Sequence, residues 1–557
     1  MAQVHAAQVL ARALKQQGVE HVFGVIGIPV NDVAPALQAE GIQFFGMHHE
    51  QGAAYAAQCL GYLTRRPGVC LTVSGPGSTN TISPLANAQA NAWPLLVLSG
   101  GSDLSRRGMG EFEEMPQIEA TLPYTKLSLV AQRPERLPVY VEQAMRAALF
   151  GRPGAAYLEL PGDVITSVID EEAVERAHSV GEPPRPEATA AQIDAALAAL
   201  RSAQRPLLIF GKGAAYACAE DELRRLVDLT GIPWLSSPMG KGLIPDDHPL
   251  STAACRTYAL QNADLVLMAG ARFNWIFHFG QPPRFARDVR VIQIDIAPEE
   301  IGRNVPAEVG IAGDAKAVLA QINAALTAHP WRFSGDSWLQ ALDVERQKNV
   351  QRAEPLLDSN DLPMNFYRML RVIRDVLPRD AIVTAEGAAT MDISRQVLNT
   401  YEPRHRIDAG TLGTMGVGTG EAIAAQIANP NARVLALEGD SAFGFDGMEI
   451  EVAVRYRLPI VFVVANNNGI GGGPEELDYD QPLPPGCFVP GIRYEKIMEA
   501  FGGLGFYAET PEEFHKALED AFAARQPALV NVRINPGARR REQQFGWSTH
   551  AGATAHG

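Results

Sequence analysis

The strongest constraint on the fold is a strand–helix–strand pattern in the C-terminal third of the chain. Two apolar runs, 434–437 and 459–464, flank a helix-like segment, Met448 to Arg457. A unit of about 30 residues has the length of a right-handed crossover between parallel strands. Gly439-Asp440-Ser441 follows the first run, and Asn466-Asn467-Asn468 follows the second. We therefore expect these polar groups at the carboxyl ends of neighbouring parallel strands, where open α/β sheets bind ligands.

The residue types after these strands predict a metal–diphosphate site. The Asp440 carboxylate, the Asn467 amide oxygen and the Gly469 carbonyl suit Mg²⁺, which prefers oxygen ligands and shares its coordination shell with phosphates. Backbone N–H groups of the segment after Asp440 would face the same phosphates at a helix start. The alternative is purely structural, because Gly-Asp is a common turn and runs of Asn are common in loops.

Two other segments carry polar or glycine-rich patterns at element boundaries. The first, Met47 to Ala54, contains His48-His49-Glu50 after an apolar run and opens a helix of small residues, 53–60. As structure alone, its carboxylate would only cap that helix. The second, Gly410 to Gly418, has four glycines, which allow close approach of backbone to a ligand. Its Met415 would otherwise be an ordinary filler of the core.

Bulk properties exclude several classes of protein. A chain of 557 residues predicts two to four domains. The net charge of −15 disfavours nonspecific binding to nucleic acid. Five cysteines without a CxxC pair are typical of a reducing compartment. We expect no membrane association and no secretion signal, and hence a cytoplasmic protein.

Alternating strand-like and helix-like runs predict an α/β fold of three doubly wound parallel-sheet domains. A linker rich in charge and proline, 170–190, and a polar aperiodic connection, 331–363, divide the chain. The tail carries Arg539 to Arg541 and two aromatic residues, Phe545 and Trp547, which favour a lid over a frayed end. The expected units are 1–170, 190–330, 364–536 and the tail, 537–557.

Taken together, the three segments resemble the thiamine diphosphate (ThDP) enzymes, whose signature is Gly-Asp-Gly followed some 25 to 30 residues later by Asn-Asn. Ser441 replaces the third glycine. The resemblance implies pyrimidine-binding, middle and diphosphate-binding domains. It also implies a homodimer at minimum, with the cofactor between the first domain of one subunit and the last domain of another, and such dimers often pair into tetramers.

The same resemblance assigns roles to individual residues. Glu50 would hydrogen-bond the pyrimidine N1′ of the cofactor and so promote loss of its C2 proton. The Gly413 carbonyl would accept from the 4′-amino group, and Met415 would wedge the two rings into a bent conformation. The implied cofactor-binding set is Glu386, Gly387, Ala388, Gly413, Met415, Gly439, Ser441, Ala442, Asn467 and Ile470. The implied metal ligands are Asp440, Asn467 and Gly469.

Four shorter strings narrow the resemblance to the branch that holds oxalyl-CoA decarboxylase and 2-hydroxyacyl-CoA lyase. They are 24–29, 211–216, 270–275 and 438–445. Two further strings, 403–410 and 544–547, look closer to the lyases. In this branch the middle domain can bind ADP, and the matching residues here are Arg152, Lys212, Arg272, Asp295 and Asp314. Structural salt bridges are the alternative for them, and flavin is the less expected occupant. Arg404, Arg406 and the arginines of the tail are candidates to meet phosphates of CoA.

Two positions separate the lyase from the decarboxylase. Phe112 and Gly471 both stand where the decarboxylase pattern has Tyr, so two hydroxyl donors are missing and space has opened. Because a buried substrate carboxylate needs donors, this pocket suits an aldehyde or ketone fragment better. The resemblance therefore implies a lyase that cleaves a 2-hydroxyacyl-CoA to formyl-CoA and a carbonyl compound, reversibly. His48, His49 and Glu113 are candidates for proton transfer. The alternatives are an oxalyl-CoA decarboxylase and a non-catalytic protein that binds ADP or CoA.

Overall fold

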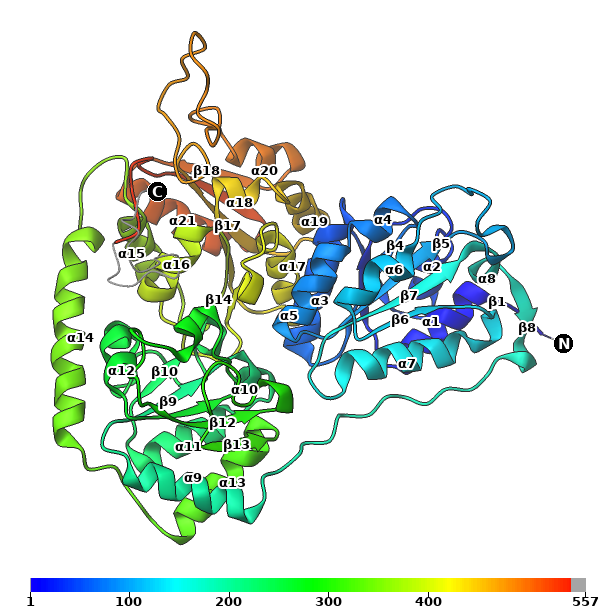
Figure 1. Cartoon of the computed structure of the whole chain (residues 1–557). Coiled ribbons are helices and arrows are strands. Elements are labelled where there is room, and N and C mark those ends of the chain that lie inside the picture. The colour runs from blue at the N-terminus through cyan, green and yellow to red at the C-terminus, as the bar shows by residue number, and fades with distance from the viewer. Residues whose placement is uncertain (1, 542–557) are drawn as a thin grey trace.

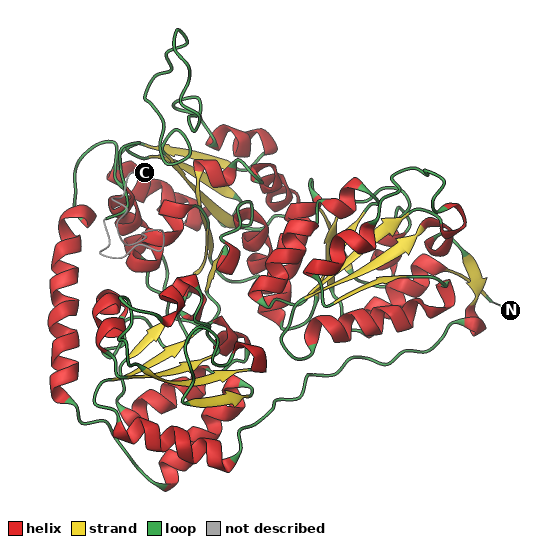
Figure 2. Cartoon of the chain, in the orientation of Figure 1, coloured by secondary structure: helices red, strands yellow, loops and turns green. Residues whose placement is uncertain are grey.

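Three α/β units follow one another along the chain, as Figures 1 and 2 show for the computed structural model. The structure describes residues 2–541. Each unit is built on a parallel sheet with helices on both faces (Figure 2). The prediction of three doubly wound α/β domains is therefore confirmed. Among the described residues, none of the helices is both long enough and apolar enough to cross a membrane.

The N-terminal domain has a six-stranded parallel sheet in the order β3-β2-β4-β5-β7-β6. Its strands are β2 (His21–Gly24), β3 (Gln43–Gly46), β4 (Gly68–Thr72), β5 (Leu95–Gly101), β6 (Leu127–Val130) and β7 (Ala155–Pro161). A short antiparallel pair, β1 (Gln3–His5) and β8 (Val168–Asp170), closes the domain. The helices are α1 (Ala6–Gln16), α2 (Val33–Ala39), α3 (Glu50–Thr64), α4 (Pro76–Thr79), α5 (Ile82–Asn91), α6 (Gln117–Thr121), α7 (Leu137–Leu149) and α8 (Gly162–Ile165). The central strands β4, β5 and β7 are buried along their whole length because helices cover both faces.

The middle domain follows a long extended connection that is visible in Figure 1. Its five-stranded parallel sheet has the order β10-β9-β11-β12-β13. The strands are β9 (Pro206–Phe210), β10 (Trp234–Ser236), β11 (Leu265–Ala269), β12 (Arg290–Asp295) and β13 (Val309–Ala312). The helices are α9 (Ala190–Ser202), α10 (Lys212–Tyr216), α11 (Glu220–Thr230), α12 (Arg256–Asn262) and α13 (Ala315–Ala328).

The C-terminal domain repeats the six-stranded arrangement, with the order β15-β14-β16-β17-β19-β18. The strands are β14 (Ile382–Ala385), β15 (Arg406–Asp408), β16 (Val434–Gly439), β17 (Ile460–Asn466), β18 (Leu504–Ala508) and β19 (Ala528–Arg533). The helices are α15 (Phe366–Val376), α16 (Ala388–Val397), α17 (Gly418–Ala428), α18 (Asp440–Phe443), α19 (Ile450–Arg455), α20 (Glu495–Phe501) and α21 (Pro511–Ala524). Strands β16 and β17 are parallel neighbours, as the spacing of the two apolar runs predicts.

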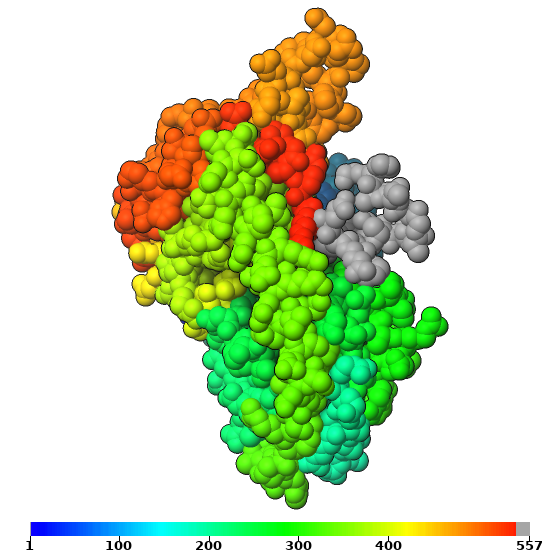
Figure 3. Space-filling view, turned by 90° about the vertical axis from the view of Figure 1, so that its left-hand side faces the viewer, coloured from blue at the N-terminus to red at the C-terminus, as the bar shows by residue number. Residues whose placement is uncertain are grey.

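The connection between the middle and C-terminal domains differs from the prediction. The stretch read as polar and aperiodic contains α14 (Asp336–Leu357), a helix of 22 residues. It runs along the surface beside both domains (Figures 1 and 3) and buries only Trp338, Leu342 and Leu357. Because so few of its residues face a core, the helix carries no apolar stripe for sequence analysis to detect.

Two helices join the N-terminal and C-terminal domains within one chain. Helix α3 packs against α17, and the Cys59 thiol donates to the carbonyl of Glu421 at 3.7 Å. Side chains from both domains form one continuous apolar core around this contact. The C-terminal domain also carries a loop, 471–491, that projects from the body of the molecule (Figures 1 and 3). The predicted lid aromatics Phe545 and Trp547 lie outside the described residues.

Candidate active site

Glu50 lies at the N-terminus of α3, directly after the edge strand β3. His49 is extended, and its ring Nδ1 accepts from the backbone N–H of Gln51 at 3.0 Å, so the imidazole caps the helix. Glu50 follows in the first turn and is only 8% exposed. Its Oε2 accepts from the side-chain amide of Asn80 at 2.9 Å. A buried carboxylate with one polar partner keeps its second oxygen for a ligand.

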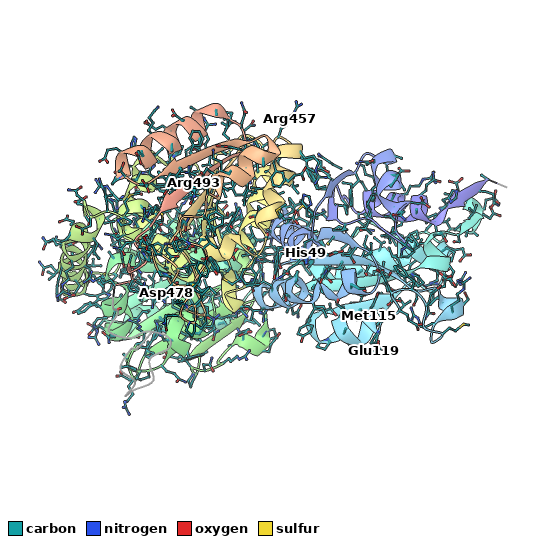
Figure 4. All side chains as sticks on the ribbon, turned by 90° about the horizontal axis from the view of Figure 1, so that it is seen from above. His49, Met115, Glu119, Arg457, Asp478 and Arg493 are labelled. Carbon is teal, nitrogen blue, oxygen red and sulfur yellow. The ribbon has the colours of Figure 1, made fainter. Side chains whose placement is uncertain are left out.

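The neighbouring histidines are engaged in joining the two domains. The Glu449 carboxylate accepts from the backbone N–H groups of His48, at 3.1 Å, and of His49, at 2.9 Å. The His48 ring also lies 2.9 Å from the Glu451 carboxylate. Figure 4 shows His49 at the boundary of the two domains. The structure thus gives both rings a local partner, and neither role requires proton transfer to a substrate.

Glu113 and Phe112 lie on the loop that follows β5. The hydroxyl of Ser74 donates to Glu113 Oε2 at 2.7 Å. Glu113 itself has a φ of +56°, a left-handed conformation that non-glycine residues rarely adopt. Phe112 is 67% exposed. Residues of one loop, 74–80, therefore contact both Glu50 and Glu113, although neither Ser74 nor Asn80 was singled out from the sequence.

The predicted metal ligands converge at the ends of β16 and β17. The amide oxygen of Asn467 lies 2.9 Å from the Gly469 carbonyl oxygen and 3.1 Å from Oδ1 of Asp440. Three acceptors this close repel one another unless a cation lies among them. Oxygens at about 2.1 Å from an octahedral Mg²⁺ are about 3 Å apart, which is the spacing found. Without a cation, rotation of the amide would let its nitrogen donate to both oxygens and its oxygen accept from the backbone N–H of Gly472 at 3.2 Å. The donor set therefore fits Mg²⁺.

The Asp440 carboxylate is held in place by backbone donors. It accepts from the N–H groups of Ser441 at 2.7 Å, Gly469 at 2.9 Å and Asn467 at 3.2 Å. Burial nevertheless raises the pKa of Asp440 to about 6, against the opposing effect of these hydrogen bonds. A bound divalent cation would remove that penalty by supplying the missing positive charge.

The glycine loop before α17 is anchored by Glu386. Its carboxylate accepts from the backbone N–H groups of Gly416, Val417 and Gly418, the last two at 2.8 and 2.6 Å. Burial raises the pKa of Glu386 to about 7, although these bonds oppose the rise. The prediction placed Glu386 along the diphosphate, whereas its side chain faces the loop instead and fixes the position of Met415, which is half-buried.

The remaining predicted cofactor residues open short helices or lie on turns. Gly387 has a φ of +93° and precedes α16, whose first residue is Ala388. Gly439 precedes α18, which contains Ser441 and Ala442. Gly413 has a φ of +61°, and Ile470 is 64% exposed. Gly471 has a φ of +72°, and a Cβ built there would meet no heavy atom within 4 Å. Open space therefore adjoins Gly471 in the single chain.

The five predicted ADP residues line one cavity of about 370 Å³ at the junction of the three domains. Arg152 comes from the N-terminal domain, and the wall is completed by Asp408, Gly410 and Thr411 of the C-terminal domain. The other four, which belong to the middle domain, are Lys212, Arg272, Asp295 and Asp314.

The charges around this cavity have defined partners. Arg152 pairs with Glu300 at 2.8 Å, and Asp314 caps α13 by accepting from Ala317 N–H at 2.9 Å. Burial raises the pKa of Asp295 to about 6. Burial, with Arg272 nearby, lowers the pKa of Lys212 well below its ordinary value. A polyanionic ligand with hydroxyl groups would satisfy both residues.

One of the arginines predicted to meet CoA phosphates is placed elsewhere. Arg406 is 1% exposed on β15, where it donates to Ser394 Oγ at 2.8 Å, so the prediction for it is wrong. Strand β15 is at the edge of its sheet, but the middle domain covers it. Arg404 is half-buried and pairs with Glu220 at 3.0 Å. In the tail, Arg540 pairs with Asp392, which also binds Arg395 at 2.9 Å.

In the first domain a buried Glu begins a helix, and in the last domain a cation site of the kind that binds diphosphates lies at the ends of two strands. These two features together define a cofactor-dependent enzyme. The sequence matches the N-terminal TPP binding domain of thiamine pyrophosphate enzymes over residues 4–120, their central domain over 193–322 and their C-terminal TPP binding domain over 386–532. The chain belongs to the thiamine pyrophosphate enzyme family.

Full-length relatives place it in a particular branch of that family. It is 45% identical to 2-hydroxyacyl-CoA lyase 1 of Homo sapiens, with 99% of this chain and 98% of the relative covered. It is 44% identical to 2-hydroxyacyl-CoA lyase of Arabidopsis thaliana and 40% identical to oxalyl-CoA decarboxylase of Escherichia coli K12, with 95% of both chains covered in each case. The branch is thus that of 2-hydroxyacyl-CoA lyases and oxalyl-CoA decarboxylases, as the sequence motifs indicate.

Proposed function

We propose that this protein is a thiamine diphosphate-dependent lyase that cleaves a 2-hydroxyacyl-CoA to formyl-CoA and an aldehyde or ketone, and that joins these products in reverse. The observation that carries the choice is the open, donor-free surface at Gly471 and Phe112. Neither side chain can donate to a substrate carboxylate, and the direction of the Gly471 Cβ is empty to 4 Å. An alkyl or branched carbonyl fragment suits such a surface, whereas the carboxylate of oxalyl-CoA would lack a donor there.

The residues of the chain divide the work between binding and proton control. Thiamine diphosphate, when bound, supplies a carbon nucleophile and an electron sink for the C1–C2 bond of the acyl-CoA. Glu50 would hold and exchange the proton at the pyrimidine N1′. Met415 and the Gly413 carbonyl would orient the pyrimidine, and the backbone at Ser441 and Ala442 would bind the diphosphate. Asp440, Asn467 and the Gly469 carbonyl would hold Mg²⁺.

A comparison of two substrates tests this function. Purified protein with thiamine diphosphate and Mg²⁺ would receive 2-hydroxyisobutyryl-CoA or oxalyl-CoA, and formyl-CoA would be followed by chromatography. We expect faster cleavage of the hydroxyacyl ester, with one acetone released for each formyl-CoA. Faster release of CO₂ from oxalyl-CoA would make the protein a decarboxylase and contradict the interpretation of Phe112 and Gly471.

Filling the space at Gly471 should narrow the range of substrates. Gly471→Ala adds one methyl group, so we expect about a tenfold or greater fall in kcat/KM for the branched ester and a smaller fall for glycolyl-CoA. Gly491→Ala is the matched control, because Gly491 lies on the same loop with a similar φ of +68° and also has no heavy atom within 4 Å of a built Cβ. Equal losses in the two variants would assign the effect to backbone strain.

The active unit in this proposal is a homodimer at minimum, as a dimer or within a tetramer. Each chain contributes two half-sites, one around Glu50 beside α4 and one around Asp440 in α18. Figure 1 shows α4 and α18 on either side of the packed helices α3 and α17. Large apolar side chains are exposed near both half-sites. They are Ile26, Ile28, Phe112 and Met115 in the N-terminal domain, and Leu412, Phe445, Met448 and Ile470 in the C-terminal domain. Surfaces of this kind favour a protein partner, here a second copy.

Mixing two inactive variants tests the shared site. If Glu50 of one subunit and Asp440 of the other belong to the same active site, a heterodimer of Glu50→Gln and Asp440→Ala chains contains one intact site. Co-refolding equal amounts should then restore about a quarter of the wild-type rate, since half of the dimers would be mixed. Activity that stays at the level of the separate variants would place both groups in one chain.

The cavity at the domain junction is proposed to bind ADP. Asp295 ends β12, where a carboxylate can accept from ribose hydroxyls. Asp295→Ala should weaken ADP binding about 10- to 100-fold, the usual loss for a hydrogen bond to a charged group. Calorimetric titration would measure it, with Asp194→Ala on the exposed face of α9 as control. Undiminished affinity in the Asp295 variant would exclude this placement.

A further inference from the structure

One short loop contacts both acidic side chains of the N-terminal half-site. Residues 74–80 leave β4 and include the single turn of α4. Backbone hydrogen bonds from Thr79 N–H to the Gly75 carbonyl and from Asn80 N–H to the Pro76 carbonyl, both 3.0 Å, fix its shape. Ser74 is at the start of this loop and Asn80 at its end, so the loop fixes the positions of the two side chains relative to each other.

The end of the loop fixes one oxygen of Glu50. An ionised carboxylate only accepts hydrogen bonds, so the Asn80 contact of 2.9 Å must come from the amide nitrogen. This leaves Oε1 of Glu50 for a partner outside the domain. A Cβ at Gly77 would lie 3.1 Å from that oxygen and 2.5 Å from Val73 Cγ2. Glycine at 77 thus keeps Oε1 uncovered.

The start of the loop fixes Glu113. Ser74 Oγ donates to Glu113 Oε2 at 2.7 Å. Gly75 has a φ of +53°, and a Cβ there would lie 2.6 Å from the Glu113 carbonyl oxygen. Only glycine at 75 lets the backbone of Glu113 pack this closely, and Glu113 is in turn held at a φ of +56°. The carboxylate of Glu113 is therefore positioned by the same loop as that of Glu50.

We infer that loop 74–80 is a positioning element of the active site, in which Asn80 sets the orientation of Glu50 and Ser74 sets that of Glu113. The inference rests on the proposed function, in which Glu50 acts on the cofactor, and on the assignment of Glu113 from the sequence motifs as a candidate for proton transfer to the substrate. Asn80 and Ser74 act through these two acids and need not touch a ligand. Their effects are separable: Asn80 governs cofactor activation, and Ser74 governs steps that follow substrate binding.

The test separates the two effects in the holoenzyme. The variants are Asn80→Ala, Ser74→Ala and the control Thr166→Ala, an exposed residue of the same domain outside this loop, whose hydroxyl donates to the Gly162 carbonyl at 2.7 Å. Three quantities are measured: affinity of the cofactor-depleted protein for thiamine diphosphate, the rate of hydrogen–deuterium exchange at cofactor C2 without substrate, and kcat and KM for the hydroxyacyl-CoA.

Asn80→Ala should slow C2 exchange about 10- to 100-fold with little change in cofactor affinity. Ser74→Ala should leave exchange unchanged and lower kcat about tenfold. Thr166→Ala should change none of the three.

Two further variants show whether Asn80 acts through Glu50. In a Glu50→Gln background, Asn80→Ala should have no additional effect on C2 exchange, since the side chain that Asn80 orients can no longer exchange the proton. Asn80→Ser, which keeps a donor, should recover part of the lost rate. Additive losses in the double variant, or exchange unaffected by Asn80→Ala, would overturn the inference. Slow exchange in the wild type itself would instead count against the proposed function.

Discussion

Glu50→Gln is expected to lower the rate of carbon–carbon cleavage about 10²- to 10⁴-fold, the usual contribution of a positioned proton-transfer group. Glutamine has nearly the same shape and can still accept from Asn80, but it can neither hold nor release a proton at the pyrimidine N1′. Because most contacts to the cofactor come from other residues, the affinity for thiamine diphosphate should change by less than about tenfold. Steady-state kinetics and titration of the cofactor-depleted protein measure the two quantities.

The burial of Glu50 makes this outcome specific. The carboxylate is 8% exposed and lies in the first turn of α3, so the substitution leaves the surface charge pattern nearly intact. Glu20→Gln, at an exposed site before β2, is a suitable control and should leave the rate unchanged. Cleavage by Glu50→Gln at the wild-type rate would remove Glu50 from the mechanism and transfer the role to another acid, with Glu113, which contacts the same loop, as the candidate.

Asp440→Ala is expected to abolish retention of the cofactor, with at least a 10²-fold loss of affinity for thiamine diphosphate in the presence of Mg²⁺. The substitution removes the one carboxylate of the proposed metal site. It also leaves the N–H groups of Ser441, Asn467 and Gly469 without their acceptor, which destabilises both loops at the ends of β16 and β17. Equilibrium binding and the cofactor-induced rise in Tm would both report the loss.

An isosteric variant separates the metal from the loops. Asp440→Asn keeps an acceptor for the backbone but lowers the negative charge, so high Mg²⁺ should restore part of the cofactor binding in this variant and not in Asp440→Ala. Asp478, which is labelled in Figure 4, lies on the projecting loop 471–491. Asp478→Ala removes an exposed acid of the same domain and is the control. Cofactor affinity in Asp440→Ala that equals the wild type would show that these oxygens do not hold the diphosphate metal.

Much of the architecture can be predicted from local pattern. The helical pattern at 6–16 forms α1, and the apolar runs at 206–210 and 265–269 form strands β9 and β11. The expected strands around Asp440 and Asn467 are β16 and β17, and they are parallel neighbours. Helix α14 shows where this approach fails, because a helix that buries three residues has no periodic apolar signal.

The site residues also divide into those that a local motif locates and those that it does not. Glu50 and Asp440 are found at strand-to-helix junctions, as the motifs indicate. The direction of the Glu386 side chain and the burial of Arg406 are not visible in a motif, since each depends on a partner in another element. Asn80 is 30 residues from Glu50 in the chain, and in the sequence it has the pattern of an ordinary turn residue.

The sequence by itself therefore determined the three parallel-sheet domains, their order, and the chemical groups placed at the ends of the strands. Apolar period and turn residues specify such elements because each depends on near neighbours in the chain. Only the tertiary structure decided which groups face each other at the site: Asn80 faces Glu50, Ser74 faces Glu113, and the Asn467 amide oxygen lies 2.9 Å from the Gly469 carbonyl oxygen and 3.1 Å from Asp440 Oδ1. Those contacts join loops distant in sequence, and their geometry arises only when the domains pack.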